Sequence, residues 1–89
     1  MNILPLRVAL AQINVTVGDL EGNSQKIRSA MQNAYSAGAQ IVCTPELALT
    51  GYPPEDLLLK PGFVANNLRK LEELIEASHD FPGLAAVIG

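Results

Sequence analysis

The residues best suited to chemistry lie in the segment 44–59, where an apolar run ends at a carboxylate. Glu46 follows residues 40–43 (QIVC), which have the pattern of a buried strand, and a dense group of turn-forming residues comes after it. Open α/β sheets bind their ligands at the carboxyl ends of their strands. Partial burial there would raise the pKa of the Glu46 carboxyl and suit it to act as a general base. The alternative is a solvated loop glutamate that happens to follow a strand.

Other reactive side chains near Glu46 are weaker candidates. Tyr52, in a Gly-Tyr-Pro-Pro turn, would either present its hydroxyl to a ligand or, more commonly, pack with that hydroxyl satisfied. Cys43 lies in the apolar run without an adjacent positive charge to stabilise a thiolate, so we expect a small buried hydrophobe rather than a nucleophile. Glu55 and Asp56 are adjacent and would point in different directions on a helix, so we expect helix-start charges rather than a catalytic pair.

The rest of the chain offers little reactive chemistry. His79 lies between Ser78 and Asp80, where we expect a surface residue at a helix end that the helix dipole favours. The sequence has neither the spacing of metal ligands nor a Gly-rich phosphate loop. It therefore predicts no metal site and no cofactor-binding residues within this chain.

Composition favours one small globular unit. The chain has 89 residues, of which 48% are hydrophobic and 17% charged, which is typical of a packed core rather than of disorder. The net charge of -3, with scattered basic residues, argues against a nucleic-acid or anionic-membrane partner. No apolar run approaches the ~18 residues of a membrane helix, and the first seven residues lack the features of a signal peptide. A single Cys43 agrees with a reducing compartment, so we expect a cytoplasmic location.

Three apolar runs predict strands, at residues 7–13, 40–44 and 84–88, and the first, a nearly continuous apolar run, has the pattern of a strand buried on both faces. Between the first two, Asn23 or Ser24 would cap a long helix that ends at Gly38. Its apolar face would consist of Ile27, Ala30, Met31, Ala34 and Ala37.

The second connection contains two helical patterns. Pro53 and Pro54 suit the first turn of a short helix over residues 55–59, which Pro61-Gly62 would end. A longer amphipathic helix follows. Its apolar face would comprise Val64, Leu68, Leu71, Leu74, Ile75 and Ser78, and its solvent face Arg69, Lys70, Glu72, Glu73 and Glu76.

The resulting order of strand, helix, strand, helix, strand predicts an α/β fold with two right-handed crossovers and a parallel sheet. A parallel sheet needs cover on both faces, but the sequence supplies only two long helices. In addition, Gly89 follows directly after a buried strand, whereas domains usually end in exposed polar segments. We therefore expect residues 1–89 to be a partial domain, truncated at its third strand, rather than a self-sufficient fold.

Several short motifs together resemble the opening of a nitrilase-superfamily (carbon-nitrogen hydrolase) domain. They are Ala11-Gln12, Val17-Gly18-Asp19, Asn23, Thr44-Pro45-Glu46-Leu47 and Thr50-Gly51-Tyr52. The run 45–59 (PELALTGYPPEDLLL) is similar, more specifically, to the glutaminase domains at the N-terminus of bacterial glutamine-dependent NAD synthetases. The resemblance covers essentially the whole chain. It implies a nitrilase-like α-β-β-α sandwich, of which residues 1–89 would be the first β-α-β-α-β portion.

The resemblance also implies roles for individual residues. The family uses a Glu, Lys, Cys triad, and Glu46 matches its glutamate, which would take the proton of the thiol and later help ammonia to leave. The family's lysine and cysteine lie beyond Gly89, and Cys43 does not match the motif of that cysteine. The isolated chain is therefore expected to be inactive. Tyr52 would line the glutamine pocket, and the scaffold would include Gln12, Gly18, Asp19 and Asn23.

Implied partners are glutamine and, through a synthetase domain absent from residues 1–89, ATP, magnesium and nicotinic acid adenine dinucleotide, which the parent would amidate to NAD. The parent is expected to be a homo-oligomer.

Two alternatives to this function remain. One is an amidase of the same superfamily that acts on a different amide or carbamoyl substrate. The other is a non-catalytic interaction module that binds a partner through exposed apolar surface.

Overall fold

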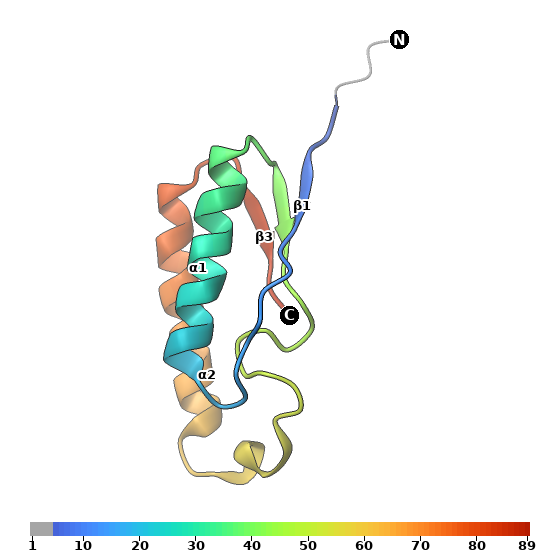
Figure 1. Cartoon of the computed structure of the whole chain (residues 1–89). Helices are drawn as coiled ribbons and strands as arrows, with labels where there is room; N and C mark the ends of the chain where they lie inside the picture. The colour runs from blue at the N-terminus through green and yellow to red at the C-terminus, as the bar shows by residue number, and fades with distance from the viewer. Residues whose placement is uncertain (1–4) are drawn as a thin grey trace.

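The computed structural model describes residues 5–89 as a three-stranded parallel sheet with two long helices (Figure 1). The strands are β1 (Val8–Leu10), β2 (Ile41–Cys43) and β3 (Ala85–Val87), in the spatial order β1-β2-β3. Helix α1 (Leu20–Ser36) joins β1 to β2, and β2 is joined to β3 by η1 (Glu55–Leu59), α2 (Phe63–Ala77) and η2 (Ser78–Asp80). The predicted element order and parallel pairing are confirmed, with shorter strands. Residues 1–4, which enter the prediction about a signal peptide, lie outside the described residues.

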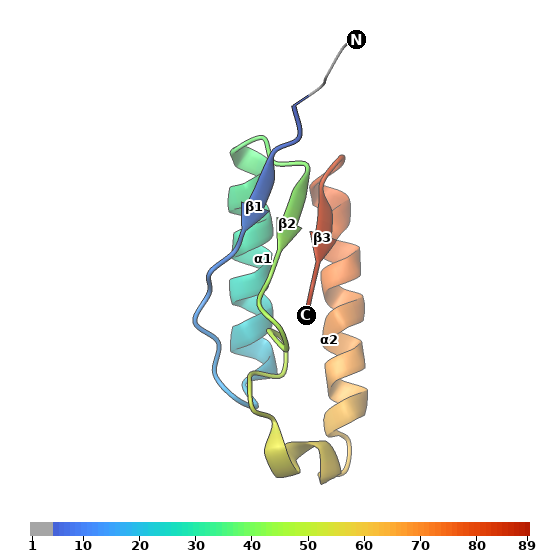
Figure 2. The same cartoon turned by 90° about the vertical axis from the view of Figure 1, so that its right-hand side faces the viewer.

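Both long helices lie on the same face of the sheet (Figures 1 and 2). On that face, Val42 is 1% exposed and Ala9 packs against the core. The opposite face carries Val8, Leu10 and Val87, which are 47%, 74% and 57% exposed. The prediction that the first strand is buried on both faces is wrong for this chain, because nothing within residues 5–89 covers its second face.

The core fills the space between the helices and the sheet. Its buried members are Ile27, Met31, Ala34, Ala39, Val42, Ala48, Leu49, Leu74 and Phe81. The predicted apolar face of α1 is confirmed at Ile27, Met31 and Ala34, whereas Ala37 is exposed beyond the last helical residue. Two core residues, Ala48 and Leu49, come from the segment after β2 and anchor that segment beneath the helices.

Helix α1 begins earlier than predicted. Its N-cap is Asp19, whose Oδ1 accepts a hydrogen bond from the Gly22 amide at 3.0 Å, rather than Asn23 or Ser24. A side-chain acceptor at this position satisfies one of the free amides of the first turn. Asn23 is instead inside the helix, and its side chain is completely buried. The residue is therefore free to bind the neighbouring loops rather than its own helix.

Two predicted helix boundaries coincide with glycines in the left-handed conformation. Gly38, at φ +79°, follows α1, and its amide donates to the Tyr35 carbonyl at 3.0 Å. Gly62, also at φ +79°, is the N-cap of α2, directly after the predicted break. Glycine adopts this conformation without the steric cost of a Cβ atom. Both predicted ends are confirmed.

The predicted apolar face of α2 is confirmed only in part, at Leu71 and Leu74. Phe63 and Leu74 are buried and Leu71 is half-buried. Three residues of the predicted apolar face are instead about half exposed: Val64 at 50%, Leu68 at 53% and Ile75 at 56%. The helix carries apolar residues on two sides, and only one side has a partner in residues 5–89. No helix in the described part of the chain is both long enough and apolar enough to cross a membrane.

Lys70 joins the two long helices, although the sequence predicted it on the solvent face of α2. Its Nζ binds the carboxylate of Glu21 in α1 and lies 3.0 Å from Glu73 Oε2. The hydrogen bond from Lys70 lowers the pKa of Glu21, and the same bond raises the pKa of Lys70. The pair therefore favours the charged form of both groups.

Candidate functional site

The segment from Thr44 to Gly51, hereafter the Glu46 turn, leaves the carboxyl end of β2 where the sequence predicted a site. The Glu46 side chain is exposed, and no hydrogen bond or ion pair reaches it within residues 5–89. The predicted partial burial of Glu46 is therefore wrong for this chain. Its role as a general base stays a prediction.

The backbone of the Glu46 turn is strained beside the carboxylate. Leu47 has φ +52°, the left-handed region that costs a residue with a Cβ atom about 1–2 kcal/mol. The Gly51 amide closes the turn on the Leu47 carbonyl at 2.8 Å, and Ala48 and Leu49 are buried. Strain of this kind persists only where the surroundings hold it. Contacts on both sides of the turn supply that restraint.

On the α1 side, the Asn23 amide binds the turn to the loop that precedes the helix. Its Oδ1 accepts from the Thr16 amide at 2.8 Å, and its Nδ2 donates to the Thr16 carbonyl at 2.7 Å and the Leu49 carbonyl at 2.9 Å. The Gly18 amide adds a bond to the Thr50 carbonyl at 2.8 Å. One completely buried side chain thus joins two loops that are far apart in sequence.

On the β3 side, the turn contacts the segment that follows the strand (Figure 2). Thr44 Oγ1 donates to the Val87 carbonyl at 3.3 Å and accepts from the Gly89 amide at 3.1 Å. The Ala48 amide donates to the Gly89 oxygen at 3.1 Å. A Cβ atom at Gly89 would lie 2.8 Å from Glu46 Cα, so the backbone passes directly against the carboxylate-bearing residue.

Sequence reasoning considered Asn23 only as a helix cap and as part of the scaffold, and missed its contacts with the Glu46 turn. A signal was present: Asn23 precedes Ile27 and Met31 at four-residue spacing, so it is a polar residue on the buried stripe of α1. A buried amide at such a position must find hydrogen-bond partners. No comparable signal marked Gly89 or Thr44, because their contacts depend on how the strands pair.

The other predicted site residues do not gather around Glu46. Tyr52 is 68% exposed, so the packing interpretation is wrong, and its role in lining a glutamine pocket stays a prediction. The peptide bond after it is cis. Cys43 is half-buried on the uncovered face, paired with Val87 across the sheet, rather than inside the helix-covered core. The absence of a nucleophilic role for Cys43 stays a prediction.

The charged residues that were predicted at helix ends, Glu55 and Asp56 and also His79, lie there on the surface. Glu55 and Asp56 lie in the first turn of η1, as helix-start charges. His79 is exposed in η2, with its Nδ1 3.8 Å from Glu76 Oε1. No group of three His, Cys, Asp or Glu side chains gathers into a possible metal site anywhere in residues 5–89.

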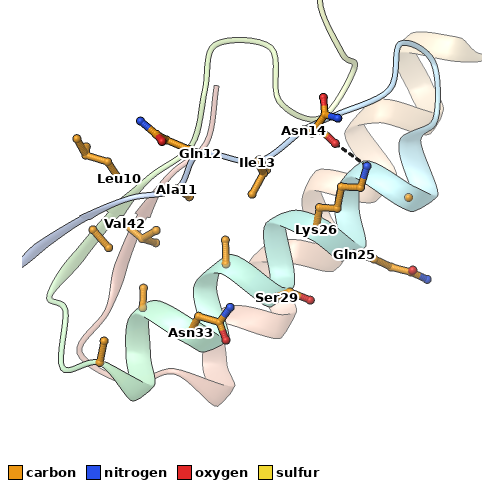
Figure 3. A pocket seen from close by; sticks show the side chains of 15 residues that line it. Leu10, Ala11, Gln12, Ile13, Asn14, Gln25, Lys26, Ser29, Asn33 and Val42 are labelled. Carbon is orange, nitrogen blue, oxygen red and sulfur yellow. Dashed lines mark hydrogen bonds between the residues drawn. The ribbon is translucent and has the colours of Figure 1, made fainter.

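A groove of about 810 Å³ lies between β1 and α1 (Figure 3), and Glu46 is not among the residues that line it. Figure 3 shows Leu10 and Gln12 pointing away from α1, while Lys26 reaches the Asn14 carbonyl at 2.5 Å. Lys26 is the sole charged residue among those that line the groove, and that bond engages it. The groove follows the free edge of β1 and has the character of an open sheet edge rather than of a reaction site.

Comparison with known proteins gives a consistent family assignment. The family model described as carbon-nitrogen hydrolase matches residues 7–86. The chain is 45% identical over 85 residues to the glutamine-dependent NAD(+) synthetase of Xylella fastidiosa, with 94% of this chain and 15% of that protein covered. It is 43% identical to the enzyme of that name from Aquifex aeolicus, with 92% and 14% covered. The chain thus spans about 15% of the length of the curated relatives that it matches.

Solved structures of similar proteins share the fold. A glutamine-dependent NAD(+) synthetase from Cytophaga hutchinsonii superposes with a TM-score of 0.76 at 33% identity, covering 81% of this chain and 12% of that one. The synthetase from Acinetobacter baumannii, solved with adenosine diphosphate, gives a TM-score of 0.77 at 30% identity, covering 94% and 15%. The predicted α/β fold is therefore confirmed, and so is its likeness to the NAD synthetase glutaminase domain.

Proposed function

Since this chain belongs to the carbon-nitrogen hydrolase family, we propose that it is the N-terminal part of a glutamine-hydrolysing NAD synthetase. The longer protein would release ammonia from glutamine and use it, with ATP, to amidate nicotinic acid adenine dinucleotide to NAD. The observation that carries this proposal is the similarity of nearly the whole chain to proteins named glutamine-dependent NAD(+) synthetase. The residues 1–89 would supply one part of the glutaminase site.

Glu46 is the residue through which this chain would take part in the reaction. It would accept the proton of a cysteine thiol and return a proton to the departing ammonia. Two features support this role. Glu46 follows the carboxyl end of β2, and hydrogen bonds hold its turn on both sides, from Asn23 in α1 and from Gly89 after β3. The lysine and the cysteine of the triad would come from the remainder of the protein, so residues 1–89 alone would be inactive.

The uncovered sheet face supports the proposal of a partial domain. Val8, Leu10 and Val87 present apolar side chains there, and exposed apolar surface of this kind marks an interface. In the complete domain, a second sheet would cover this face and give an α-β-β-α sandwich. The same surface would serve the alternative of a non-catalytic interaction module, which the activity measurements below separate from the enzyme.

ATP and magnesium would bind in the synthetase domain rather than here. The described residues hold no cluster of possible metal ligands, and the chain has no Gly-rich phosphate loop. The dinucleotide substrate would bind there too. We also propose a cytoplasmic location and a homo-oligomeric complete protein. Both follow from the proposed enzyme class, and no contact within residues 5–89 bears on them.

The test uses the complete protein that contains residues 1–89. Glutamate release from glutamine is measured, together with NAD formation driven either by glutamine or by ammonia. The wild-type protein is expected to form NAD from both nitrogen sources. Glu46→Gln is expected to lower the glutamine-driven rate by about 10²- to 10⁴-fold, the usual contribution of a general base, and to leave the ammonia-driven rate unchanged. Glu72→Gln, at an exposed position of α2, serves as the matched control and is expected to keep both rates.

Three results would contradict the proposal. Glutamate release without ATP-dependent amidation of the dinucleotide would indicate an amidase with another role. Equal glutamine-driven rates in Glu46→Gln and Glu72→Gln would remove Glu46 from the mechanism. A protein without either activity would leave the interaction module as the better account.

A further inference from the structure

We propose that Asn23 is a positioning residue for the Glu46 carboxylate, acting through the carbonyl of Leu49. The inference rests on the proposed role of Glu46 and adds a residue that touches neither substrate nor reacting atoms. It assigns a function to a side chain that lies in α1, more than twenty residues away from Glu46 in sequence.

The bonding of Asn23 is complete and inaccessible to solvent. The side chain is 0% exposed, and both of its Nδ2 protons and its Oδ1 have partners at 2.7–2.9 Å. Two of these partners are the amide and carbonyl of Thr16, which fix the orientation of the Asn23 side chain. The third is the Leu49 carbonyl in the Glu46 turn. The Thr16 contacts therefore aim one N–H group at the turn.

The Glu46 turn needs such a restraint because of its backbone. Leu47, the residue directly after Glu46, is held at φ +52°, which is unfavourable for a side chain with a Cβ atom. A turn that loses its outer bonds would relax towards an ordinary conformation, and the rotation at Leu47 would carry the neighbouring carboxylate with it. Displacement of a reacting group by about 1 Å costs on the order of 100-fold in rate.

A second anchor holds the other end of the same turn. Thr44 lies two residues before Glu46 in the sequence, and its Oγ1 bonds to both the Val87 carbonyl and the Gly89 amide. Asn23 and Thr44 therefore bracket Glu46 from opposite sides: one through Leu49 and one through the end of β3. The geometry of the carboxylate depends on both anchors, whereas the fold of the helices depends mainly on the apolar core.

The first experiment replaces Asn23 by an isostere in the complete protein. Asn23→Asp keeps an acceptor for the Thr16 amide but removes both donors, so the Leu49 carbonyl loses its partner. We expect kcat for glutamate release to fall by about 10- to 100-fold with KM for glutamine within about threefold, and the ammonia-driven rate to stay at the wild-type level. Asn66→Asp is the matched control: it is exposed on α2, its bond from Arg69 survives the change, and wild-type rates are expected.

The second experiment tests the other anchor and covers the case in which Asn23→Asp does not fold, seen as loss of the ammonia-driven rate. Thr44→Val removes the hydroxyl with little change in shape, and Thr44→Ser retains it. Loss of about 1 kcal/mol of hydrogen bonding predicts about a fivefold fall in kcat for Thr44→Val, with the wild-type rate in Thr44→Ser. Equal rates in the two Thr44 variants would overturn the idea of anchors around Glu46.

The results separate this inference from the proposed function. Loss of glutamine-driven activity in Glu46→Gln, together with wild-type kcat in folded Asn23→Asp, would overturn the positioning role alone. A wild-type rate in Glu46→Gln would overturn the proposed function first. A lower melting temperature of Asn23→Asp with unchanged kcat would show that Asn23 only stabilises the fold, and would likewise refute positioning.

Discussion

Gly51 packs directly against the backbone of the loop before α1, and its replacement tests this contact between the Glu46 turn and that loop. A Cβ atom on Gly51 would lie 2.5 Å from Val17 Cα and 2.8 Å from the Thr16 carbonyl oxygen. Both contacts are with backbone, which cannot move aside as a flexible side chain can. Gly51 also has φ +81°, so Gly51→Ala combines a clash with an unfavourable conformation.

Gly83→Ala isolates the conformational part of this cost. Gly83 has φ +86°, and a Cβ atom there would meet nothing within 4 Å. The left-handed conformation costs alanine about 1–2 kcal/mol, and the loss of unfolded-state freedom offsets about 0.4–1 kcal/mol of it. We therefore expect a net cost of about 1 kcal/mol for Gly83→Ala. Overpacking adds about 1–3 kcal/mol at Gly51, so we expect about 3 kcal/mol there.

Amide hydrogen exchange of the complete protein measures these local costs without requiring two-state unfolding. The Gly18 amide reports on the contact, because it donates to the Thr50 carbonyl at 2.8 Å. With tenfold for each 1.4 kcal/mol, Gly51→Ala should speed exchange in peptides covering residues 14–23 and 44–52 by about 150-fold. Gly83→Ala should speed exchange about fivefold, and only around residue 83. Similar factors in the two variants would refute the close approach of the two loops.

Two further predictions concern the helices. Leu74→Ala is expected to lower the opening free energy of the α1 and α2 amides by about 2–5 kcal/mol, because Leu74 is 2% exposed. The matched Leu68→Ala, at a 53% exposed position, should cost less than about 1 kcal/mol. Hydrogen exchange measures both costs, and equal costs would contradict the observed orientation of α2. Lys70→Met should lower the melting temperature at neutral pH, because the bond from Lys70 lowers the pKa of Glu21 and so stabilises the folded state. This stabilisation is present above 4.5, the ordinary pKa of a glutamate side chain, and is lost as the pH falls through the lowered pKa of Glu21. The difference between wild type and Lys70→Met should therefore shrink in acid and in about 1 M salt, and a difference independent of both would contradict the ion pair.

Local sequence signals predicted the elements of the fold, because each signal acts over a few residues. Glycine at Gly38 and Gly62 marked helix ends through backbone conformation, and four-residue spacing located the buried face of α1. The same logic was only partly right for α2, where it located Leu71 and Leu74 but also placed Val64, Leu68 and Ile75 on the buried side. Val64 and Leu68 are as apolar as the residues that are buried, and only the position of the sheet decides which side of the helix packs. Periodicity identifies an amphipathic helix, but the position of the sheet and core against which the helix packs determines which of its faces is buried.

The N-terminus of α1 shows how a tertiary contact overrides a local preference. Asn23 and Asp19 are both good capping residues, and the sequence alone favoured Asn23 or its neighbour. In the structure Asp19 caps the helix, which places Asn23 one turn later, four residues before Ile27 on the buried side. There its amide bonds to Thr16 and Leu49 instead of to its own helix. The choice of cap thus brings the Asn23 amide to the Glu46 turn.

The exposure of Glu46 has a physical consequence for how the site would work. The Glu46 side chain is exposed within residues 5–89, so any desolvation of a general base at this position would come from the proposed remainder of the domain. The contacts of Asn23, Thr44 and Gly89 hold the backbone of the turn that carries Glu46. Under the proposed function, positioning and activation of the base would therefore be divided between two parts of the protein. Residues 1–89 would supply the position, and the proposed remainder of the domain would supply the environment and the nucleophile.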